Sequence, residues 1–298
     1  MRILVSGSHG LVGKALIASL TSDGHEIVRL VRGKPSGATE IEWHPNQEKI
    51  DTASLEGVDA VVHLAGESIA SGRWTDEKKR AIRDSRVKGT ALLSDALARL
   101  SHPPSVCVSA SAIGYYGNRG DEVLTEKSPP GDDFLANVCV EWENATIPTI
   151  EKGIRTVHAR FGIILARKEG ALAKMLTPFR MGIGGRIGDG KQWMSWIDIE
   201  DVVNGLKSMI ENSSVNGPVN FVAPNPVTNA EFTKTLGRVL SKPTLFPVPA
   251  FGVRLAFGEM GDALLLSGAR VKPGVLQHFA YPTLEAALRH LLAGDKRG

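Results

Sequence analysis

Residues 2–20, RILVSGSHGLVGKALIASL, decide the fold of this chain. A short run rich in β-branched residues leads into a turn that carries Gly7, Gly10 and Gly13, and a helical pattern follows it. Glycine is needed there because the turn is tight, because a Cβ would block a pyrophosphate, and because the helix must pack close to the strand. Unpaired amide groups at the helix start, aided by the helix dipole, favour a diphosphate. The stretch therefore predicts a dinucleotide-binding turn that also contains Leu11 and Val12.

The chain alternates short apolar runs with segments of helical length, most regularly in its first half. Strands are expected at 2–6, 26–31, 59–65, 105–111, 155–161 and 218–222. Helices are expected at 11–24 and 81–100, and the first of them ends at a glycine. Strands that alternate with helices imply a parallel, doubly wound sheet of the α/β class with right-handed crossovers. The pattern therefore predicts a Rossmann-like fold.

The rhythm changes after residue 165. Residues 178–197, PFRMGIGGRIGDGKQWMSWI, are rich in Gly and Trp and hold little periodic structure, which suits a loop that wraps a ligand. Helical patterns return at 199–212, 229–240 and 283–293, the second opened by a capping box of Thr228 and Glu231. We expect a Rossmann-like domain over 1–165 and a smaller, mainly helical C-terminal lobe over 166–298. The helix and strand near 198–223 are expected to return to the first domain.

Composition excludes several classes of protein. A chain of 298 residues with 42% hydrophobic residues can bury one large core or two modest ones. The net charge of +3 is small, and residues 76–86 interleave acids with bases, so nucleic-acid binding is not indicated. No run of about 18 apolar residues suggests a membrane helix, and Met1 leads straight into a strand pattern, so a cytoplasmic protein is expected. Cys107 and Cys139 lack metal-ligand spacing, which predicts two buried free thiols and no metal site.

The end of the second predicted strand bears on the choice of cofactor. NAD enzymes usually place Asp or Glu there to hold the ribose 2′-hydroxyl, whereas this chain has Arg32. A guanidinium can pair bidentately with a 2′-phosphate, so NADP(H) is favoured, and an ordinary exposed arginine is the alternative. At the carboxyl end of the strand expected at 59–65, the small residues Ala65 and Gly66 leave room for adenosine and ribose. Ser109 and Ser111 lie at the carboxyl end of the next expected strand, where open α/β sheets bind their ligands.

Several further stretches resemble one known family. They are, in chain order, GSHGLVG, HLAGESI, IRDSRVKGT, SASAIGYYG, FLANVCVEWE, RFGIIL, PFRMGIGGRIGDGKQWMSWIDIED, APNPVTNAEF and FGEMGDALLLSGARVKP. Together they are similar to the YfcH-like epimerase family, a group of atypical extended short-chain dehydrogenases/reductases. The resemblance runs from Met1 to about Leu292. It implies a Rossmann-like domain that binds NADP(H), with no settled substrate.

The resemblance also implies cofactor contacts at the matching positions. They are the turn over 7–13, Arg32, Leu64, Ala65, Arg86 and Ile164. Arg86 stands where related extended enzymes have an asparagine, and a cation there could reach a phosphate or amide oxygen of the cofactor. Asp198 replaces the histidine that the family often shows, so a role of that imidazole does not carry over to this chain.

The catalytic pair of the typical family members is missing. Those enzymes use a tyrosine, whose pKa a lysine four residues later lowers, to exchange a proton with the substrate hydroxyl. Ser111 fits their accompanying serine, but Phe134 and Val138 replace the pair. One reading is that another group supplies the proton, and the candidates are Tyr115, Tyr116 and Glu67. Each has a structural alternative, because the tyrosines could simply pack and the glutamate could cap a helix.

The segment rich in Gly and Trp suggests where a substrate binds. Phe179, Trp193 and Trp196, with Arg160 and Arg186, would give an aromatic and cationic lining for a planar or phosphorylated ligand. Arg160 is also a candidate for cofactor contact, and Tyr116 for substrate contact. A core position is the alternative for Trp196, which continues an apolar pattern.

Two functions remain open. The first is an NADP(H)-binding oxidoreductase or nucleotide-sugar-type epimerase that acts on a small molecule, phosphorylated or nucleotide-linked. The second is a non-catalytic NADP(H)-binding sensor or regulatory protein, because a fold does not guarantee chemistry. An enclosing substrate loop favours the enzyme, since hydride transfer requires that water be excluded. A hydrolase finds little support, because the sequence has no GxSxG elbow.

Overall fold

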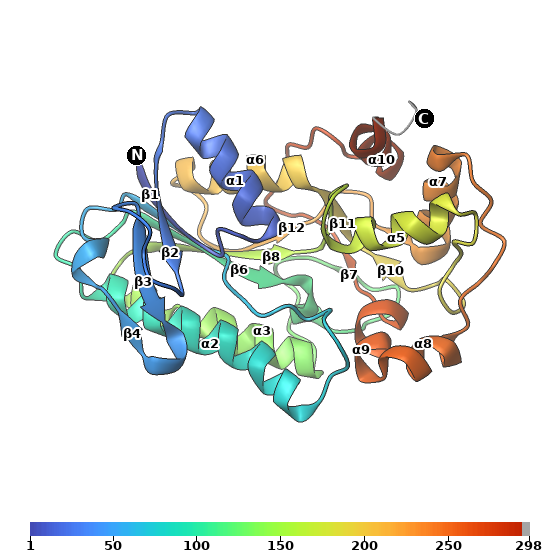
Figure 1. Ribbon diagram of the computed structural model, residues 1–298, viewed down its shortest axis with the longest axis horizontal. Coiled ribbons are helices and arrows are strands. Elements are labelled where there is room, and N and C mark those ends of the chain that lie inside the picture. Colours follow the sequence, from blue (N-terminus) through green and yellow to red (C-terminus); the bar gives the residue numbers. More distant parts are fainter. Residues whose placement is uncertain (294–298) are drawn as a thin grey trace.

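The computed structural model describes residues 1–293. Its main element is one large sheet, with strands between residues 2 and 221 (Figure 1). Its strand order is β12-β8-β6-β5-β1-β2-β3-β4, and all neighbouring pairs are parallel except β3 and β4. These strands are β1 (Arg2–Ser6), β2 (Glu26–Val31), β3 (Glu40–His44), β4 (Lys49–Ile50), β5 (Ala60–His63), β6 (Val106–Ala112), β8 (Arg155–Phe161) and β12 (Gly217–Phe221). The predicted α/β class and doubly wound, mainly parallel sheet are confirmed.

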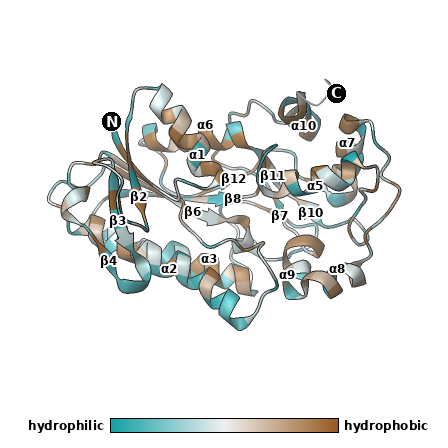
Figure 2. Ribbon diagram, in the orientation of Figure 1, coloured by the Kyte–Doolittle hydropathy of each residue, from teal (hydrophilic) through white to brown (hydrophobic). Residues whose placement is uncertain are grey.

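Helices cover both faces of the sheet (Figure 1). The first face carries α1 (Leu11–Ser22) and α6 (Ile199–Glu211), and the second carries α2 (Asp76–Ala98), α3 (Phe134–Asn144) and α4 (Ile147–Glu151). Side chains of β1 alternate between the two faces of the sheet, so the hydrophobic core has two parts. Ile3 and Val5 pack with α1 and α6, whereas Leu4 packs with α2. Helix α2 is hydrophilic along much of its length in Figure 2, as expected when only one face is buried.

The strands and helices with clear periodicity lie where the sequence places them. All six expected strands are present, with ends that differ by at most two residues. Helix α2 begins five residues earlier than expected, because the Thr75 side chain accepts a hydrogen bond from the Lys78 amide and caps it there. The predicted capping box of Thr228 and Glu231 is confirmed at the start of α7 (Asn229–Leu240).

The elements that periodicity did not predict are short. Strand β7 (Val123–Leu124) pairs with β14 (Arg270–Val271), β9 (Ile163–Leu165) with β11 (Trp196–Asp198), and β10 (Trp193–Met194) with β13 (Val227–Thr228). A strand of two or three residues has no detectable period and is fixed by a partner far away in the sequence. The other helical elements that were not predicted are η1 (Pro45–Gln47), η2 (Ala53–Leu55), η3 (Ile113–Tyr116), α5 (Gly170–Arg180), α8 (Ala250–Phe257), α9 (Glu259–Gly261) and η4 (Asp262–Leu266). The helix expected at 283–293 is present as α10 (Leu284–Leu292).

A second hydrophobic core lies among α5, α7 and α10. Trp196 is fully buried in it, so the prediction that this residue belongs to the core is confirmed. The segment 178–197 was expected to be irregular throughout, but it includes the end of α5 and strands β10 and β11. Its irregular part is therefore the glycine-rich stretch between α5 and β10.

The segment after α7 crosses back toward the first half of the chain. Arg73, just before α2, donates hydrogen bonds to the carbonyl oxygens of Leu255 and Ala256 in α8. Lys79 of α2 pairs with Glu259 of α9 at 2.7 Å. Strand β14 also pairs with β7, which lies between β6 and α3 in the sequence. The C-terminal part of the chain therefore lies beside the carboxyl end of β6.

The predicted state of both cysteines is confirmed, since Cys107 and Cys139 are buried free thiols. Within residues 1–293, no helix has the length and apolar content needed to cross a membrane. The same residues contain no cluster of His, Cys, Asp or Glu that could hold a metal ion.

Asp198 has an unusual environment at the junction of β11 and α6. Its side chain is fully buried, its Oδ1 accepts the Glu200 amide at 2.8 Å, and its Oδ2 has no partner among the described residues. Burial raises the pKa of this carboxyl from 3.8 to about 6. The folded protein therefore binds this proton more tightly than the unfolded chain does between pH 6 and 3.8, and its stability rises as the pH falls through that window.

We predict that Asp198→Asn stabilises the protein at pH 8 by roughly 2 kcal/mol, because it removes a buried charge and retains a good N-cap. The gain should shrink as the pH falls below 6. Urea unfolding of wild type and variant from pH 8 to 5 measures the free energy of unfolding. A difference that is independent of pH, or a variant that is less stable at pH 8, would contradict the assignment.

Candidate cofactor and active site

A cavity of about 510 Å³ opens along the carboxyl ends of the central strands. It begins at the turn after β1, passes the ends of β5, β6 and β8, and reaches residues 263–269 of the C-terminal region. The strand order reverses between β1 and β5, so the cavity starts at the topological switch point of the sheet. Open α/β sheets bind their ligands at this position.

The glycine turn lies at the start of the cavity, and backbone packing requires two of its glycines. Gly7 has φ +66°, and a Cβ on it would lie 2.7 Å from the Leu64 carbonyl oxygen. A Cβ on Gly13 would lie 2.3 Å from the Gly7 carbonyl oxygen. Gly10 is the N-cap of α1 and offers no side chain to its first turn, so amides at this helix start face the cavity without a capping group.

A buried hydrogen-bonded chain braces this turn against the neighbouring strand. Ser6 Oγ accepts the amides of Leu64 at 3.0 Å and Ala65 at 3.2 Å. It lies 2.7 Å from His63 Nδ1, and His63 Nε2 lies 3.1 Å from Thr90 Oγ1. Burial lowers the pKa of His63 to about 4, so the ring is neutral at neutral pH, accepts from Ser6 and donates to Thr90. Sequence analysis missed these residues because their partners come from three separate elements.

Arg86 is the cation in the cavity wall. Its guanidinium donates to the carbonyl oxygens of Glu67 and Ile82 at 3.0 Å each and lies 5.1 Å from the Trp142 ring centroid. It forms no ion pair with any described residue, and burial lowers its pKa. Arg86 also approaches the position where Gly66 would carry a Cβ, at 3.4 Å. A positive group beside the glycine turn is what a phosphate-bearing cofactor requires.

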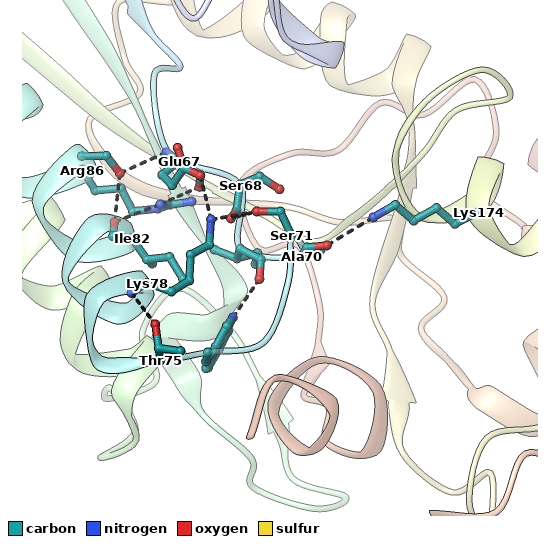
Figure 3. A network of polar contacts seen from close by, with 12 residues as sticks. Glu67, Ser68, Ala70, Ser71, Thr75, Lys78, Ile82, Arg86 and Lys174 are labelled. Atoms are coloured by element: carbon teal, nitrogen blue, oxygen red, sulfur yellow. Dashed lines mark hydrogen bonds and ion pairs between the residues drawn. The ribbon is translucent and has the colours of Figure 1, made fainter. Parts of the chain in front are cut away.

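A strap, residues 67–75, connects β5 to α2 beside the cavity (Figure 3). Lys78 holds it, because its Nζ donates to Glu67 Oε1 and to Ser71 Oγ at 2.7 Å each. Lys174 of α5 reaches the Ala70 carbonyl oxygen from the other side at 3.4 Å. The strap contributes Ile69 to the cavity wall, so it links the two halves of the molecule at the cavity.

Glu67 does not have the environment expected of a catalytic base. Its carboxylate pairs with Lys78, and that hydrogen bond lowers its pKa. It does not line the cavity. The expectation of a proton-transfer role for Glu67 is therefore corrected, and its structural role is to hold the strap.

Five of the expected cofactor residues do not line the cavity, namely Arg32, Ala65, Gly66, Ser109 and Arg160. Arg32 is exposed at the carboxyl end of β2, beside the strand that carries the glycine turn. Ser109 is buried in β6, which pairs with β5 on one side and β8 on the other, and it does not line the cavity. The structure thus corrects the expectation for Ser109, whereas Arg32 stays at a strand end that a ribose phosphate could reach. Leu64 and Ile164, in contrast, line the cavity together with Leu11 and Val12.

Ser111 lines the cavity and is hydrogen-bonded from behind. Its Oγ donates to Glu143 Oε1 at 2.7 Å. Glu143 is itself held by Arg160, through contacts of 2.7 Å to Nε and 2.7 Å to Nη2. Because a carboxylate paired in this way only accepts hydrogen bonds, the Ser111 proton is committed to it. The lone pairs of Ser111 are then the part of the hydroxyl that is left for a ligand.

Arg160 is therefore not in contact with the cavity, which corrects its expected role in binding. Its side chain is 3% exposed and is enclosed by Glu143, Tyr115 and Tyr116. Burial alone would lower the pKa of Arg160, but the hydrogen bonds and charge of Glu143 outweigh burial and raise it. The guanidinium remains charged and organises the polar groups beneath the cavity floor.

Neither candidate tyrosine lines the cavity. Tyr116 is fully buried, donates to Asn220 Oδ1 at 2.7 Å and accepts from Arg160 at 3.0 Å. Burial raises the pKa of its hydroxyl. The Tyr115 ring packs on the Arg160 guanidinium, 3.4 Å from its centroid. The η3 turn instead exposes Gly114 and Gly117 to the cavity.

The helix that would carry the tyrosine and lysine pair forms a largely apolar wall. The Phe134 ring packs edge-on against Trp74 and under the Lys79 ammonium, and Val138 lines the cavity. Cys139 also lines it, and burial raises the pKa of this thiol to about 12, so it stays protonated at neutral pH. Asp133, the N-cap of α3, is the one carboxylate among the described residues that line the cavity.

The expected aromatic and cationic substrate lining is only partly present. Trp193 lines the cavity and donates from Nε1 to Asp121 at 2.8 Å. Phe179 is buried in the second core and Arg186 is exposed, and neither lines the cavity, so these two expectations are corrected. In their place the wall includes Ala263, Leu264 and other residues of 263–269, which sequence analysis did not identify because they lie far from the glycine turn in the chain.

Comparison with known proteins places this chain in a family. The NAD dependent epimerase/dehydratase family matches residues 3–222, which include every strand of the large sheet. The chain belongs to this family. A second match, to a domain of unknown function named DUF1731, covers residues 248–291 and therefore the segment 263–269 of the cavity wall.

Relatives in this family come from distant organisms. An epimerase family protein of Mycobacterium tuberculosis is 43% identical over 94% of this chain and 92% of its own length. Human epimerase family protein SDR39U1 (isoform 2), solved with NADPH, is 36% identical, covers 98% of this chain and 99% of that one, and has a TM-score of 0.91. A nucleoside-diphosphate sugar epimerase from Corynebacterium glutamicum is 39% identical over 98% of this chain and 58% of its own, with a TM-score of 0.81. The predicted resemblance is confirmed.

We predict that Glu143→Gln lowers the free energy of unfolding by about 3 kcal/mol, because it leaves the Arg160 charge buried without a counter-charge. Glu141→Gln, in the same helix, provides the control. Glu141 pairs with Arg83 on the surface, where both side chains are at least 40% exposed, so its loss should change stability by less than about 1 kcal/mol. Equal effects of the two substitutions in urea unfolding would contradict this account of the buried pair.

Proposed function

We propose that this protein is an NADP(H)-dependent oxidoreductase or epimerase that acts on a small molecule bearing a hydroxyl group. The observation that supports it most directly is the course of the cavity, which runs without interruption from the glycine turn to Ser111 and on to the C-terminal segment 263–269. Such a cavity holds a dinucleotide and a second ligand end to end. The human relative solved with NADPH adds support, because its chain matches this one over nearly all of its length.

The residues of the cavity fit NADP(H). The amides at the start of α1 would receive the diphosphate, and Arg86 supplies a cation beside them. Arg32 would pair with the 2′-phosphate at the end of β2, where an acidic residue would repel it. When bound, the cofactor supplies a hydride donor or acceptor, and the protein orients the reacting group and excludes water.

Ser111 would orient the reacting hydroxyl. Because its own proton is donated to Glu143, Ser111 accepts a hydrogen bond from the ligand, and an alcohol donates one. Glu143 and Arg160 are positioning residues in this proposal, since they act on the ligand only through Ser111. The absence of the tyrosine and lysine pair favours the second candidate, a sensor that binds NADP(H) without turnover, and the two candidates differ in whether Ser111 matters for a reaction.

We predict that wild type binds NADPH more tightly than NADH and that Arg32→Ala loses most of this preference, by about tenfold or more, because a charge-assisted contact is removed. Calorimetric titration of ligand-free protein with each cofactor measures the ratio. Lys34→Ala, two residues further along the same exposed loop, is the control and should keep the preference. Equal affinity of wild type for the two cofactors would contradict the role of Arg32.

We predict that Ser111→Ala leaves NADPH affinity within about twofold and reduces turnover by about a hundredfold or more, because the reacting hydroxyl loses its hydrogen-bond partner. Formation of NADPH from NADP⁺, followed at its absorbance with a panel of alcohols, measures turnover. Ser109→Ala is the control: it removes a hydroxyl from the same strand at a position that does not line the cavity, and it should leave turnover unchanged. Turnover by wild type that Ser111→Ala leaves unchanged would reduce Ser111 to a scaffold residue, and no turnover with any alcohol would favour the sensor.

A further inference from the structure

The part of the cavity beyond Ser111 has a distinct composition. We call it the substrate end and define it by Leu135, Val138, Trp193, Ala263, Leu264 and Ala269. Five of these side chains are aliphatic, and Leu264 belongs to a hydrophobic cluster with Trp74 and Ile82. Three separate parts of the chain contribute them, namely α3, the start of β10 and the region around η4. From this lining we propose that the substrate is uncharged and largely apolar, with a hydroxyl as its polar group, and that it carries no phosphate.

The charges around the substrate end support this proposal. Among the described lining residues, Arg86 has the only basic lysine or arginine side chain and Asp133 the only acidic carboxyl side chain. Arg86 lies at the cofactor end, where it donates to the Glu67 carbonyl oxygen. An anionic group at the substrate end would therefore meet the Asp133 carboxylate and no lining cation. A buried phosphate without cationic donors is strongly unfavourable, and like charges in a binding site suppress binding.

Three other arginines do not line the cavity. Arg160 is neutralised by Glu143 under the cavity floor, and Arg186 is exposed outside the cavity. Arg270 packs on the Trp193 ring, 4.3 Å from its centroid, and is not a lining residue. The aromatic wall residue thus separates the Arg270 guanidinium from the ligand space.

Apart from Arg86 and Asp133, few polar side chains line the cavity, and these include Ser111, Asn118 and Ser267. Ser195 also borders the cavity, but its Oγ donates to the Ala269 carbonyl oxygen at 2.7 Å and accepts the Val271 amide at 2.9 Å, so it is already satisfied. Ser111 keeps free lone pairs at the junction with the cofactor end. A ligand with an apolar body and a hydroxyl near Ser111 would bury apolar surface without leaving a polar group unpaired.

This inference rests on the proposed function in one respect, which is that the cavity beyond Ser111 receives the substrate. The test compares two probes of equal carbon number, the neutral 4-phenylbutan-2-ol and the anionic 4-phenylbutanoate, with UDP-glucose as a phosphate-bearing probe. Saturation-transfer NMR titrations at pH 7.5 give the affinity of each probe for ligand-free and NADP⁺-loaded protein. Binding of NADP⁺ is measured separately by calorimetry.

We expect the alcohol to bind at least about tenfold more tightly than the carboxylate, and UDP-glucose not to displace it. Asp133→Asn should reduce the ratio of the alcohol affinity to the carboxylate affinity to within about threefold, because it removes the repelling charge and keeps the N-cap. Asp132→Asn, a neighbouring exposed carboxylate that does not line the cavity, is the control and should keep the wild-type ratio. Leu264→Arg should reverse the preference, because it places a cation in the wall.

The inference is overturned if the carboxylate or UDP-glucose binds wild type as tightly as the alcohol, if no probe binds, or if Asp132→Asn narrows the ratio as much as Asp133→Asn. The failure of the proposed function has a different signature. A preference for the alcohol in a protein that does not bind NADP⁺ would support the ligand class and contradict the NADP(H) proposal. Binding of NADP⁺ without a preference for the alcohol would support the NADP(H) proposal and contradict the inferred substrate class.

Discussion

The close approach of three backbone segments at the start of the sheet is the constraint on which the rest of the structure depends. The turn after β1 passes so near the Leu64 carbonyl group, and α1 so near Gly7, that a Cβ at position 7 or 13 has no room. This contact sets the direction of α1 and leaves its first amides facing the cavity. Ser6 strengthens this contact from within the sheet, because its hydroxyl oxygen accepts hydrogen bonds from the backbone amides of Leu64 and Ala65, just after β5. The dinucleotide turn is therefore part of the core packing.

A layer of buried polar groups lies beneath the cavity. Where a tyrosine and lysine would place a proton donor and a cation in the wall, α3 presents Val138 and a protonated Cys139. A cation and a carboxylate, Arg160 and Glu143, pair with each other one layer deeper. Ser111 connects that layer to the cavity. In the proposed function, the reaction would depend on the Ser111 hydroxyl, whose orientation the buried ion pair controls.

The sequence predicts the parts of this molecule that have a local period or a local steric reason. Gly7, Gly10 and Gly13 follow a strand at a fixed spacing, and the six main strands have runs of β-branched residues, so both could be recognised. Contacts between distant segments left no such signal. Arg160 was expected in the cavity as part of an aromatic and cationic lining, but its pairing with Glu143 and Tyr116 is visible only when β8, α3 and η3 are brought together. The wall formed by residues 263–269 was missed for the same reason, since β14 is held by a two-residue pairing with β7.

The central claim is that NADP(H) lies along the cavity from the glycine turn to Ser111, and hydrogen–deuterium exchange with and without NADPH tests it most directly. The account predicts slower exchange on addition of NADPH in the peptides that contain residues 7–14, 64–67 and 110–114. Exchange in the exposed segment around α8 should not change. Protection confined to other regions, or no protection of residues 7–14 at saturating NADPH, would contradict the claim.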